Sequence, residues 1–219
     1  PSSRPTMRKT NPHVTVADHP PVFSQLTILR NRAPVPEEFR RKIQELSALL
    51  LFEASRFWKL KTITVETPLR SCAGLVLARP VVMVPILRAG LGMLEGMLRV
   101  LPGAEVGHIG LYRDEITLRP VSYYCRVPPN LATADILLLD PMLATGHSAC
   151  AAVALLKAQG AHAIQFVCIL ACAPGIEQLQ RAHPDVRIIA AAIDPELNEH
   201  GYIVPGLGDA GDRYVGTQS

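Results

Sequence analysis

Short runs of consecutive apolar residues constrain this chain more than any other feature of its sequence. The clearest are Val81–Leu87 and Ile136–Leu139, where side chains on both faces of a strand would be apolar. Continuously apolar strands are typical of parallel sheets that helices cover on both faces. Hydrophobic residues make up 48% of the chain and aromatic residues only 5%, so the core must be aliphatic. Both observations favour an α/β fold.

Helical patterns alternate with these strands along most of the chain. Apolar residues recur at helical spacing in residues 36–57, and Pro36 suits the first position of that helix. Further helices are predicted over 91–99, 148–160 and 175–183, and further strands over 62–66, 106–112, 164–170 and 186–193. The short apolar segment Leu75–Leu77 could be either strand or helix. This alternation predicts βαβ units and a central, mostly parallel sheet flanked by helices.

Two segments interrupt the alternation. Residues 1–21 are rich in Ser, Pro and Thr without periodicity, so we expect a flexible N-terminal arm. Residues 113–134 are polar and charged, and we expect them to form an exposed β-hairpin. Excursions of this length from a compact domain are usually functional or disordered. The predicted organisation is the arm followed by one domain at residues 22–219.

The charge distribution gives little support to a nucleic-acid-binding function. Residues 1–70 hold 12 of the 22 Lys and Arg residues but 6 of the 19 acidic residues. A solvated helix face and the arm account for this excess, because no basic run is interleaved with aromatic residues. Arg79 and Arg88 interrupt the longest apolar stretches before they could span a bilayer. We therefore expect neither a nucleic-acid partner nor a membrane segment.

The five cysteines are Cys72, Cys125, Cys150, Cys168 and Cys172. Their number is odd and no pair has C-x-x-C spacing, so neither a disulfide framework nor a zinc site is predicted. Cys168 and Cys172 lie an even number of residues apart in an apolar run, and we expect them on one buried face of a strand. Reduced, buried thiols are typical of cytosolic proteins.

The loop after Ile136–Leu139 carries the strongest signal of a functional site. Ligands of open α/β sheets bind at the carboxyl ends of strands. Thr145 to Ser148 open a predicted helix, whose free N–H groups and dipole would attract a phosphate, and Asp140 could accept hydrogen bonds from two ribose hydroxyls. A purely structural interpretation has Ser148 as N-cap and Asp140 as a turn residue. The residues alone leave both interpretations open.

This loop resembles a known family. Asp140-Pro141-Met142-Leu143-Ala144-Thr145-Gly146 is similar to the loop with which uracil phosphoribosyltransferases, of the type I phosphoribosyltransferase family, bind phosphoribosyl pyrophosphate (PRPP). The resemblance implies a phosphoribosyltransferase-type fold, with the hairpin as a lid, and a PRPP site formed by Asp140, Pro141, Met142, Leu143, Ala144, Thr145, Gly146, His147 and Ser148. His147 departs from the family, in which a second Gly is common. A His would be strained there if the position required positive φ; otherwise its imidazole could lie near the 5′-phosphate.

A second strand end, Pro85-Ile86-Leu87-Arg88-Ala89-Gly90, resembles the family's pyrophosphate-binding loop. The spacing of Gly90, Gly92 and Gly96 is not that of a dinucleotide fingerprint. In this loop Arg88 would meet the leaving group, since its planar fork binds phosphate oxygens bidentately. From the residues alone Arg88 could equally be a surface side chain at a strand end. Arg113 on the hairpin matches a second family contact to pyrophosphate.

The third segment, residues 198–213, contains Gly201, Gly206, Gly208 and Gly211, so its backbone is predicted to fold tightly. It could be an ordinary C-terminal loop, but it closely resembles the family's uracil-binding segment. The resemblance implies that main-chain atoms of Ile203, Gly208 and Ala210 hold uracil, and that Asp209 lies near the ribose.

The resemblance extends from about His19 to Thr217 and implies the family's reaction. Uracil and PRPP would give UMP and pyrophosphate in cytoplasmic pyrimidine salvage. Asp140, Arg88, Arg113 and Asp209 would form the catalytic group. Mg²⁺ would be held mainly by PRPP and water, so no metal ligands are expected from the protein. The family is oligomeric, which implies a homodimer or homotetramer, and GTP is a candidate activator because it regulates some relatives.

Three alternative functions belong to other classes or substrates. A regulator with this fold could bind pyrimidine mRNA, but such regulators lack a segment like Tyr202–Arg213. A non-catalytic relative could resemble the part fused to uridine kinases, although Asp140 and Asp209 are intact here. A transferase for another base would be distinguished by a panel of purines and pyrimidines.

Overall fold

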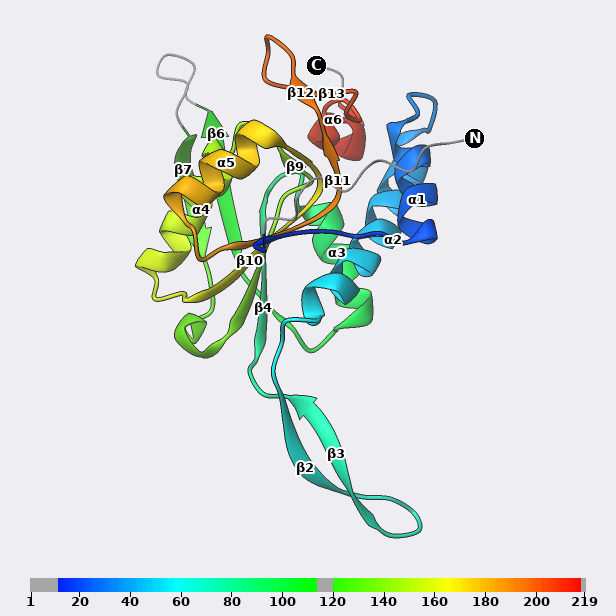
Figure 1. Cartoon of the computed structure of the whole chain (residues 1–219), viewed down its shortest axis with the longest axis vertical. Helices are drawn as coiled ribbons and strands as arrows, with labels where there is room; N and C mark the ends of the chain where they lie inside the picture. Colours follow the sequence, from blue (N-terminus) through cyan, green and yellow to red (C-terminus); the bar gives the residue numbers. More distant parts are fainter. Residues whose placement is uncertain (1–11, 114–119, 218–219) are drawn as a thin grey trace.

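The computed structural model describes residues 12–113 and 120–217 and is built around one mostly parallel sheet (Figure 1). From one edge to the other, its strands are β1 (Val14–Val16), β11 (Arg187–Asp194), β10 (Ala163–Cys172), β8 (Asp135–Leu139), β4 (Val81–Leu87), β6 (His108–Arg113) and β7 (Pro120–Arg126). Two short strands, β5 (Glu105–Val106) and β9 (Met142–Leu143), pair with β4 and β10. Every pair is parallel except β6 with β7.

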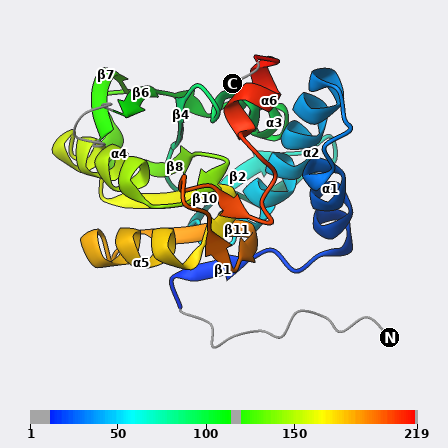
Figure 2. The ribbon, with the colours of Figure 1, turned by 90° about the horizontal axis from the view of Figure 1, so that it is seen from above.

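Helices cover both faces of the sheet, which Figure 2 shows from above. On one face lie α1 (Pro20–Arg30), α2 (Pro36–Ser55), α3 (Leu91–Val100) and α6 (Ala210–Val215); on the other lie α4 (His147–Ala158) and α5 (Ala173–Ala182). A 3-10 turn spans Leu131–Thr133. Each face has its own core cluster, one including Phe39 and Ile43 of α2, the other including Phe166 of β10 and Val153 of α4.

The predicted α/β architecture is confirmed. All residues of β4 except Leu87 are buried, as are all residues of β8 except Asp135, which fits their apolar runs. The helix predicted from Pro36 begins at Pro36, and the predicted strand and helix positions from residue 81 to 194 agree within a few residues. The short helix α6 was not predicted. No helix among residues 12–113 and 120–217 is long and apolar enough to cross a membrane.

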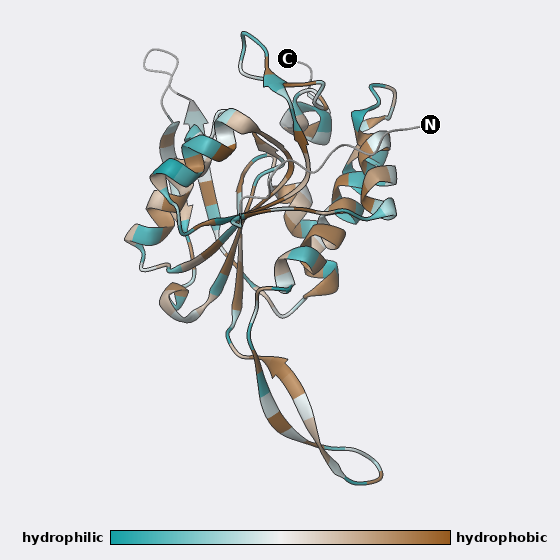
Figure 3. Cartoon of the chain, viewed as in Figure 1, coloured by the Kyte–Doolittle hydropathy of each residue, from teal (hydrophilic) through white to brown (hydrophobic). Residues whose placement is uncertain are grey.

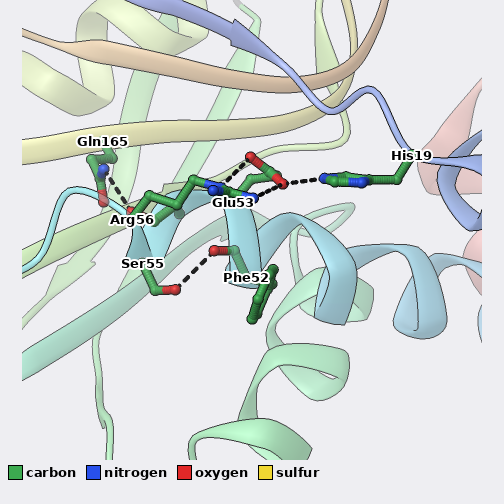
Figure 4. A network of polar contacts seen from close by, with 7 residues as sticks. His19, Phe52, Glu53, Ser55, Arg56 and Gln165 are labelled. Atoms are coloured by element: carbon green, nitrogen blue, oxygen red, sulfur yellow. Dashed lines mark hydrogen bonds and ion pairs between the residues drawn. The ribbon is translucent and has the colours of Figure 1, made fainter.

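The expectation of a flexible arm over residues 1–21 is wrong for its last part, and residues 1–11 lie outside the described residues. Val14–Val16 adds an edge strand to β11, and α1 starts at Pro20. Figure 4 shows a contact that holds this segment against the domain: His19 Nε2 lies 2.5 Å from Glu53 Oε1 of α2. Arg56 Nε donates to the other oxygen of the same carboxylate at 2.9 Å. Three-residue strands and long-range pairs of this kind have little local signal in a sequence.

One antiparallel hairpin ends the sheet at one side, and another projects from the domain. The hairpin predicted over 113–134 corresponds in part to β6 and β7, which begin earlier, at His108, and end earlier, at Arg126; residues 114–119 lie outside the described residues. The second was not predicted: β2 (Leu60–Glu66) and β3 (Ser71–Leu77) form an arm that stands away from the sheet, and Leu75–Leu77 is therefore strand. All of β2 and most of β3 is exposed despite the apolar residues visible in Figure 3.

Cys168 and Cys172 do not share a face, so that expectation is wrong. Cys168 belongs to the α4–α5 core and Cys172 to the α1–α2–α3 core. The alternation of β10 changes phase between Ile169 and Leu170, whose N–H groups both donate to the carbonyl of Pro141 at 3.0 Å. All five cysteines are free thiols.

Candidate active site

Two of the predicted site loops and the predicted hairpin adjoin neighbouring strands at one end of the sheet. Pro85 of β4 is in register with Leu139 of β8, and Leu87 of β4 with Gly110 of β6. The carboxyl ends of parallel strands lie at the same end of the sheet. Arg88, Asp140 and the end of β6 are therefore side by side. Arg113 is the last residue of β6, but its side chain lies outside the described part of the structure.

The loop from Asp140 to Ser148, here called the phosphate loop, is held by backbone contacts. Met142 and Leu143 form β9, which pairs with Leu170 and Ala171 of β10. Pro141, Leu143 and Gly146 are buried, Asp140, Met142, Ala144 and Thr145 are half-buried, and His147 and Ser148 are exposed. β10 thus extends beyond the end of β8, and its last residues pair with the backbone of the phosphate loop.

Within the phosphate loop, Gly146 is the glycine with a positive φ. Its φ is +82°, it caps α4, and His147 follows as the first helical residue. The strain that a His would suffer at positive φ therefore does not arise. The first N–H groups of α4 have no intrahelical acceptors and face outward at the helix start, where the dipole attracts an anion.

Gly175 of α5 is a residue that the sequence analysis missed. A Cβ atom there would lie 2.5 Å from the carbonyl oxygen of Ala144 and 2.6 Å from that of Leu143. The start of α5 therefore packs directly on the backbone of the phosphate loop. The Ala173-Pro174-Gly175 sequence after a buried strand was a usable signal, since a Gly at a helix start often permits a close backbone approach.

Asp140 has an unusual electrostatic environment. Burial raises the pKa of its carboxyl to about 7, and a hydrogen bond from the Met142 N–H, at 3.3 Å to Oδ1, opposes that rise. Within the described residues no Lys, Arg or His forms an ion pair with it. A half-buried carboxylate without a cationic partner is a common feature of binding and catalytic sites.

Arg88 projects into solvent beside the phosphate loop, and the peptide bond between Leu87 and Arg88 is cis. Its side chain is 60% exposed, and Arg88 Nη2 lies 3.5 Å from Asp212 Oδ1. An exposed pair of that length contributes little stability, so the guanidinium is free to bind an anion.

The segment from Tyr202 to Arg213, here called the base loop, is the third part of the site. It begins with β13 (Ile203–Val204), which pairs with β12 (Glu196–Leu197), and it ends in α6. Gly206 and Gly208 have positive φ, and the Val204–Pro205 bond is cis. Ile203 and Ala210 are buried, whereas Gly208 is exposed.

Asp209 caps α6 and orients the loop end. Its Oδ1 accepts a hydrogen bond from the Asp212 N–H at 2.8 Å, and its Oδ2 accepts one from the Tyr202 hydroxyl at 3.4 Å. The position of Asp209 near a ribose stays a prediction, whereas the structure gives it a capping role.

The base loop adjoins both other loops. Besides the Arg88–Asp212 pair, a Cβ on Gly211 would lie 3.8 Å from Ala89 Cβ. A Cβ on Gly201, the residue directly before the base loop, would lie 3.6 Å from the Thr145 methyl group. The phosphate loop, the Arg88 loop (Arg88 to Gly90) and the base loop therefore meet at one end of the sheet, although more than 100 residues separate the Arg88 loop from the base loop.

No group of three or more His, Cys, Asp or Glu side chains in residues 12–113 and 120–217 could hold a metal ion. The donors nearest the site are single carboxylates. Such a set fits a hard cation whose other ligands are substrate oxygens and water.

Comparison with known proteins gives consistent matches. The family model described as uracil phosphoribosyltransferase matches residues 16–217. A uracil phosphoribosyltransferase of Dictyoglomus turgidum is 54% identical over 94% of this chain and 100% of its own length. One from Clostridium perfringens is 50% identical over 94% and 99%. The solved structure of the AQ2163 protein from Aquifex aeolicus is 34% identical, with a TM-score of 0.87 over 92% of this chain and 97% of that chain.

Proposed function

We propose a residue-level mechanism for this chain, which belongs to the uracil phosphoribosyltransferase family. Its reaction transfers the phosphoribosyl group of PRPP to N1 of uracil, giving UMP and pyrophosphate in pyrimidine salvage. The observation that carries this assignment is the meeting of the phosphate loop and the base loop at one end of the sheet. One loop has the features of a phosphate site, and the other presents main-chain groups suited to a flat polar base.

The phosphate loop binds the ribose 5-phosphate part of PRPP. Thr145, Gly146, His147 and Ser148 supply backbone N–H groups at the start of α4, and the helix dipole favours the phosphate charge. Asp140 accepts hydrogen bonds from the two ribose hydroxyls, for which its lack of a cationic partner among the described residues leaves it available. Pro141, Met142, Leu143 and Ala144 give the loop its shape through β9.

Arg88 and Arg113 bind the pyrophosphate group and neutralise the charge that grows on it as it departs. Arg113 lies on the β6–β7 hairpin, which closes over PRPP as a lid and excludes water. Mg²⁺ would be held mainly by PRPP oxygens and waters, and would supply further neutralisation of the leaving group. The charges of Asp140 and Asp209 favour the sugar ring as it becomes cationic during displacement.

The base loop recognises uracil through main-chain atoms of Ile203, Gly208 and Ala210. Uracil offers one N–H donor between two carbonyl acceptors, and a backbone C=O between backbone N–H groups is complementary to it. The Ala210 N–H at the first position of α6 lacks an intrahelical acceptor, which supports this role. Cytosine would leave such groups unpaired, and sites of this kind can discriminate by roughly 10⁴-fold.

The active protein is a homodimer or a larger homo-oligomer. An isolated two-stranded hairpin is marginally stable in water, yet the β2–β3 arm exposes Leu60, Leu69 and Leu75 at 56%, 95% and 66%. A second copy covering the arm would bury these side chains, and sedimentation of the wild-type protein measures the assembly. The five free thiols support a cytoplasmic location. GTP is a candidate activator, which turnover with and without GTP would measure.

The reaction is tested by following pyrophosphate release from PRPP and Mg²⁺ with uracil, cytosine, thymine, hypoxanthine and adenine in parallel. Release with uracil alone is expected. Asp140→Ala should reduce turnover by on the order of 10³-fold, because it removes a ribose contact and a charge that favours the transition state. Asp185→Ala, which removes an exposed carboxylate at the opposite end of the sheet, is the control. Wild-type turnover in Asp140→Ala would contradict the mechanism.

A further inference from the structure

An arginine and an aspartate from distant parts of the chain hold the base loop in place. Arg30 is the last residue of α1, and Asp194 is the last residue of β11. Arg30 Nη1 and Nη2 donate to the two carboxylate oxygens of Asp194 at 2.7 and 2.6 Å. Two parallel charge-assisted hydrogen bonds fix the relative orientation of both side chains.

Both side chains also bond to the backbone of Gly206, in the middle of the base loop. Arg30 Nη1 donates to the Gly206 carbonyl at 2.9 Å, and the Gly206 N–H donates to Asp194 Oδ2 at 2.9 Å. Gly206 has a φ of +60°, and a Cβ there would collide with the carbonyl oxygen of Ile203. The loop therefore folds back on itself at Gly206, and the pair holds its N–H and its C=O.

Burial makes this attachment stiff. The Asp194 side chain is 6% exposed and the Arg30 side chain 26%. Separating a buried bidentate pair leaves an uncompensated charge, so the pair stays closed in the folded protein. Gly206 lies between Ile203 and Gly208, two of the residues whose main-chain atoms bind the base in the proposed function.

We propose that Arg30 and Asp194 are positioning residues for base recognition. Acting through Gly206, they set the spacing between the main-chain atoms of Ile203 and those of Gly208 and Ala210. This inference rests on the proposed function, because it assigns the spacing to uracil binding. A merely structural pair would instead affect the stability of the domain without favouring one substrate.

Arg30→Lys separates the two roles, because it keeps the positive charge and removes the fork. KM for uracil should rise about 10-fold, since small displacements of binding groups have effects of that size or larger. KM for PRPP should change less than about two-fold, because the phosphate loop is attached to β10 instead.

Arg79→Lys is the matched control at the opposite end of the sheet. Arg79 also donates to main-chain carbonyls, those of Thr133 and Ala134, each at 2.8 Å, and its Nη1 lies 3.7 Å from Asp135 Oδ1. This variant should lower the melting temperature as Arg30→Lys does, and both KM values should stay at wild-type levels. If Arg30→Lys leaves KM for uracil unchanged, or raises both KM values equally, the proposal is overturned.

Hydrogen exchange of the ligand-free protein tests the attachment without any substrate. Amides of residues 203–210 should exchange about 10-fold faster in Arg30→Lys and at the wild-type rate in Arg79→Lys. Unchanged exchange in Arg30→Lys would overturn the proposal even if uracil is the substrate. Absence of uracil turnover in the wild-type protein would instead refute the proposed function, and the exchange result would still show whether Arg30 holds the loop.

Discussion

Asp140 and Asp194 both lie where a strand of the parallel sheet ends in a site loop, but the protein neutralises the charge of only one of them. Asp194 accepts two hydrogen bonds from Arg30 and one from the Gly206 N–H. Asp140 accepts one hydrogen bond from Met142 and has no cationic partner in the described residues. The first carboxylate is satisfied by the protein, whereas the second is left for a ligand.

The same contrast applies to the loops themselves. The phosphate loop is supported by backbone pairing of β9 with β10 and by the close approach of Gly175. The base loop is held by side chains, since Arg213 donates to the carbonyls of Leu29, Asn31 and Leu207 in addition to the Arg30–Asp194 pair. The position of the phosphate loop therefore depends on small residues that permit close backbone packing. The position of the base loop depends on charged residues that are distant in the sequence.

Asparagine substitutions should shift the free energy of unfolding in opposite directions at the two aspartates. Because burial raises the pKa of Asp140 to about 7, the folded protein retains a proton there that the unfolded chain has lost. Stability therefore falls as pH rises from about 4 to 7. Asp140→Asn removes the ionisable group that causes this fall in stability. The variant should therefore raise the free energy of unfolding by on the order of 2 kcal/mol at pH 8, and by less at pH 5.

Asp194→Asn should instead destabilise by about 3 kcal/mol at pH 8, because it leaves the Arg30 guanidinium partly buried without its carboxylate. Urea denaturation at pH 5 and pH 8 measures both variants. A loss of stability in Asp140→Asn at pH 8 would show that its carboxylate is satisfied in the free protein, and the contrast between the two residues would fail.

Gly175→Ala tests the backbone support of the phosphate loop. Its methyl group would meet the carbonyl oxygens of Leu143 and Ala144, and backbone atoms cannot move aside without changing the loop. KM for PRPP should rise about 10-fold while KM for uracil stays nearly constant. Gly103→Ala is the control, since a Cβ there has no heavy atom within 4 Å. Equal effects of the two alanines on KM for PRPP would remove Gly175 from the site.

Arg213→Lys should raise KM for uracil and leave KM for PRPP nearly constant, which is the reverse of the result expected for Gly175→Ala, and the effect should be smaller. It weakens three bonds to main-chain carbonyls and the stacking of the guanidinium on Phe39, at 4.2 Å from the ring centre. The Arg30–Asp194 pair remains, so KM for uracil should rise only about 5-fold. Initial rates with each substrate varied separately measure the effect. A larger rise in KM for PRPP than for uracil would mean that the two loops are not supported independently.

The sequence predicted the phosphate loop better than the base loop because of this difference in support. A buried strand, a Gly and a helix start are adjacent in the chain, so the loop's position at the sheet edge follows from local pattern. The Arg30–Asp194 pair joins residues 164 positions apart, and neither has a distinctive neighbourhood. Likewise β1 is three residues long, and its place beside β11 depends on long-range pairing. The resemblance to a known family located the base loop, but its attachment became visible only in the fold.

Substitution of His147, where the loop departs from the family's sequence, should give the smallest effect. The condition for strain is not met because Gly146, not His147, has the positive φ, and the His147 side chain is exposed at the first position of α4. If phosphate binding uses backbone N–H groups and the helix dipole, removing the imidazole leaves those groups in place. His147→Ala should therefore change KM for PRPP by less than about two-fold. Initial rates with PRPP varied at saturating uracil measure the effect. A rise in KM for PRPP well beyond two-fold would show that the His147 side chain itself binds the phosphate, so that this loop too would depend on a side chain.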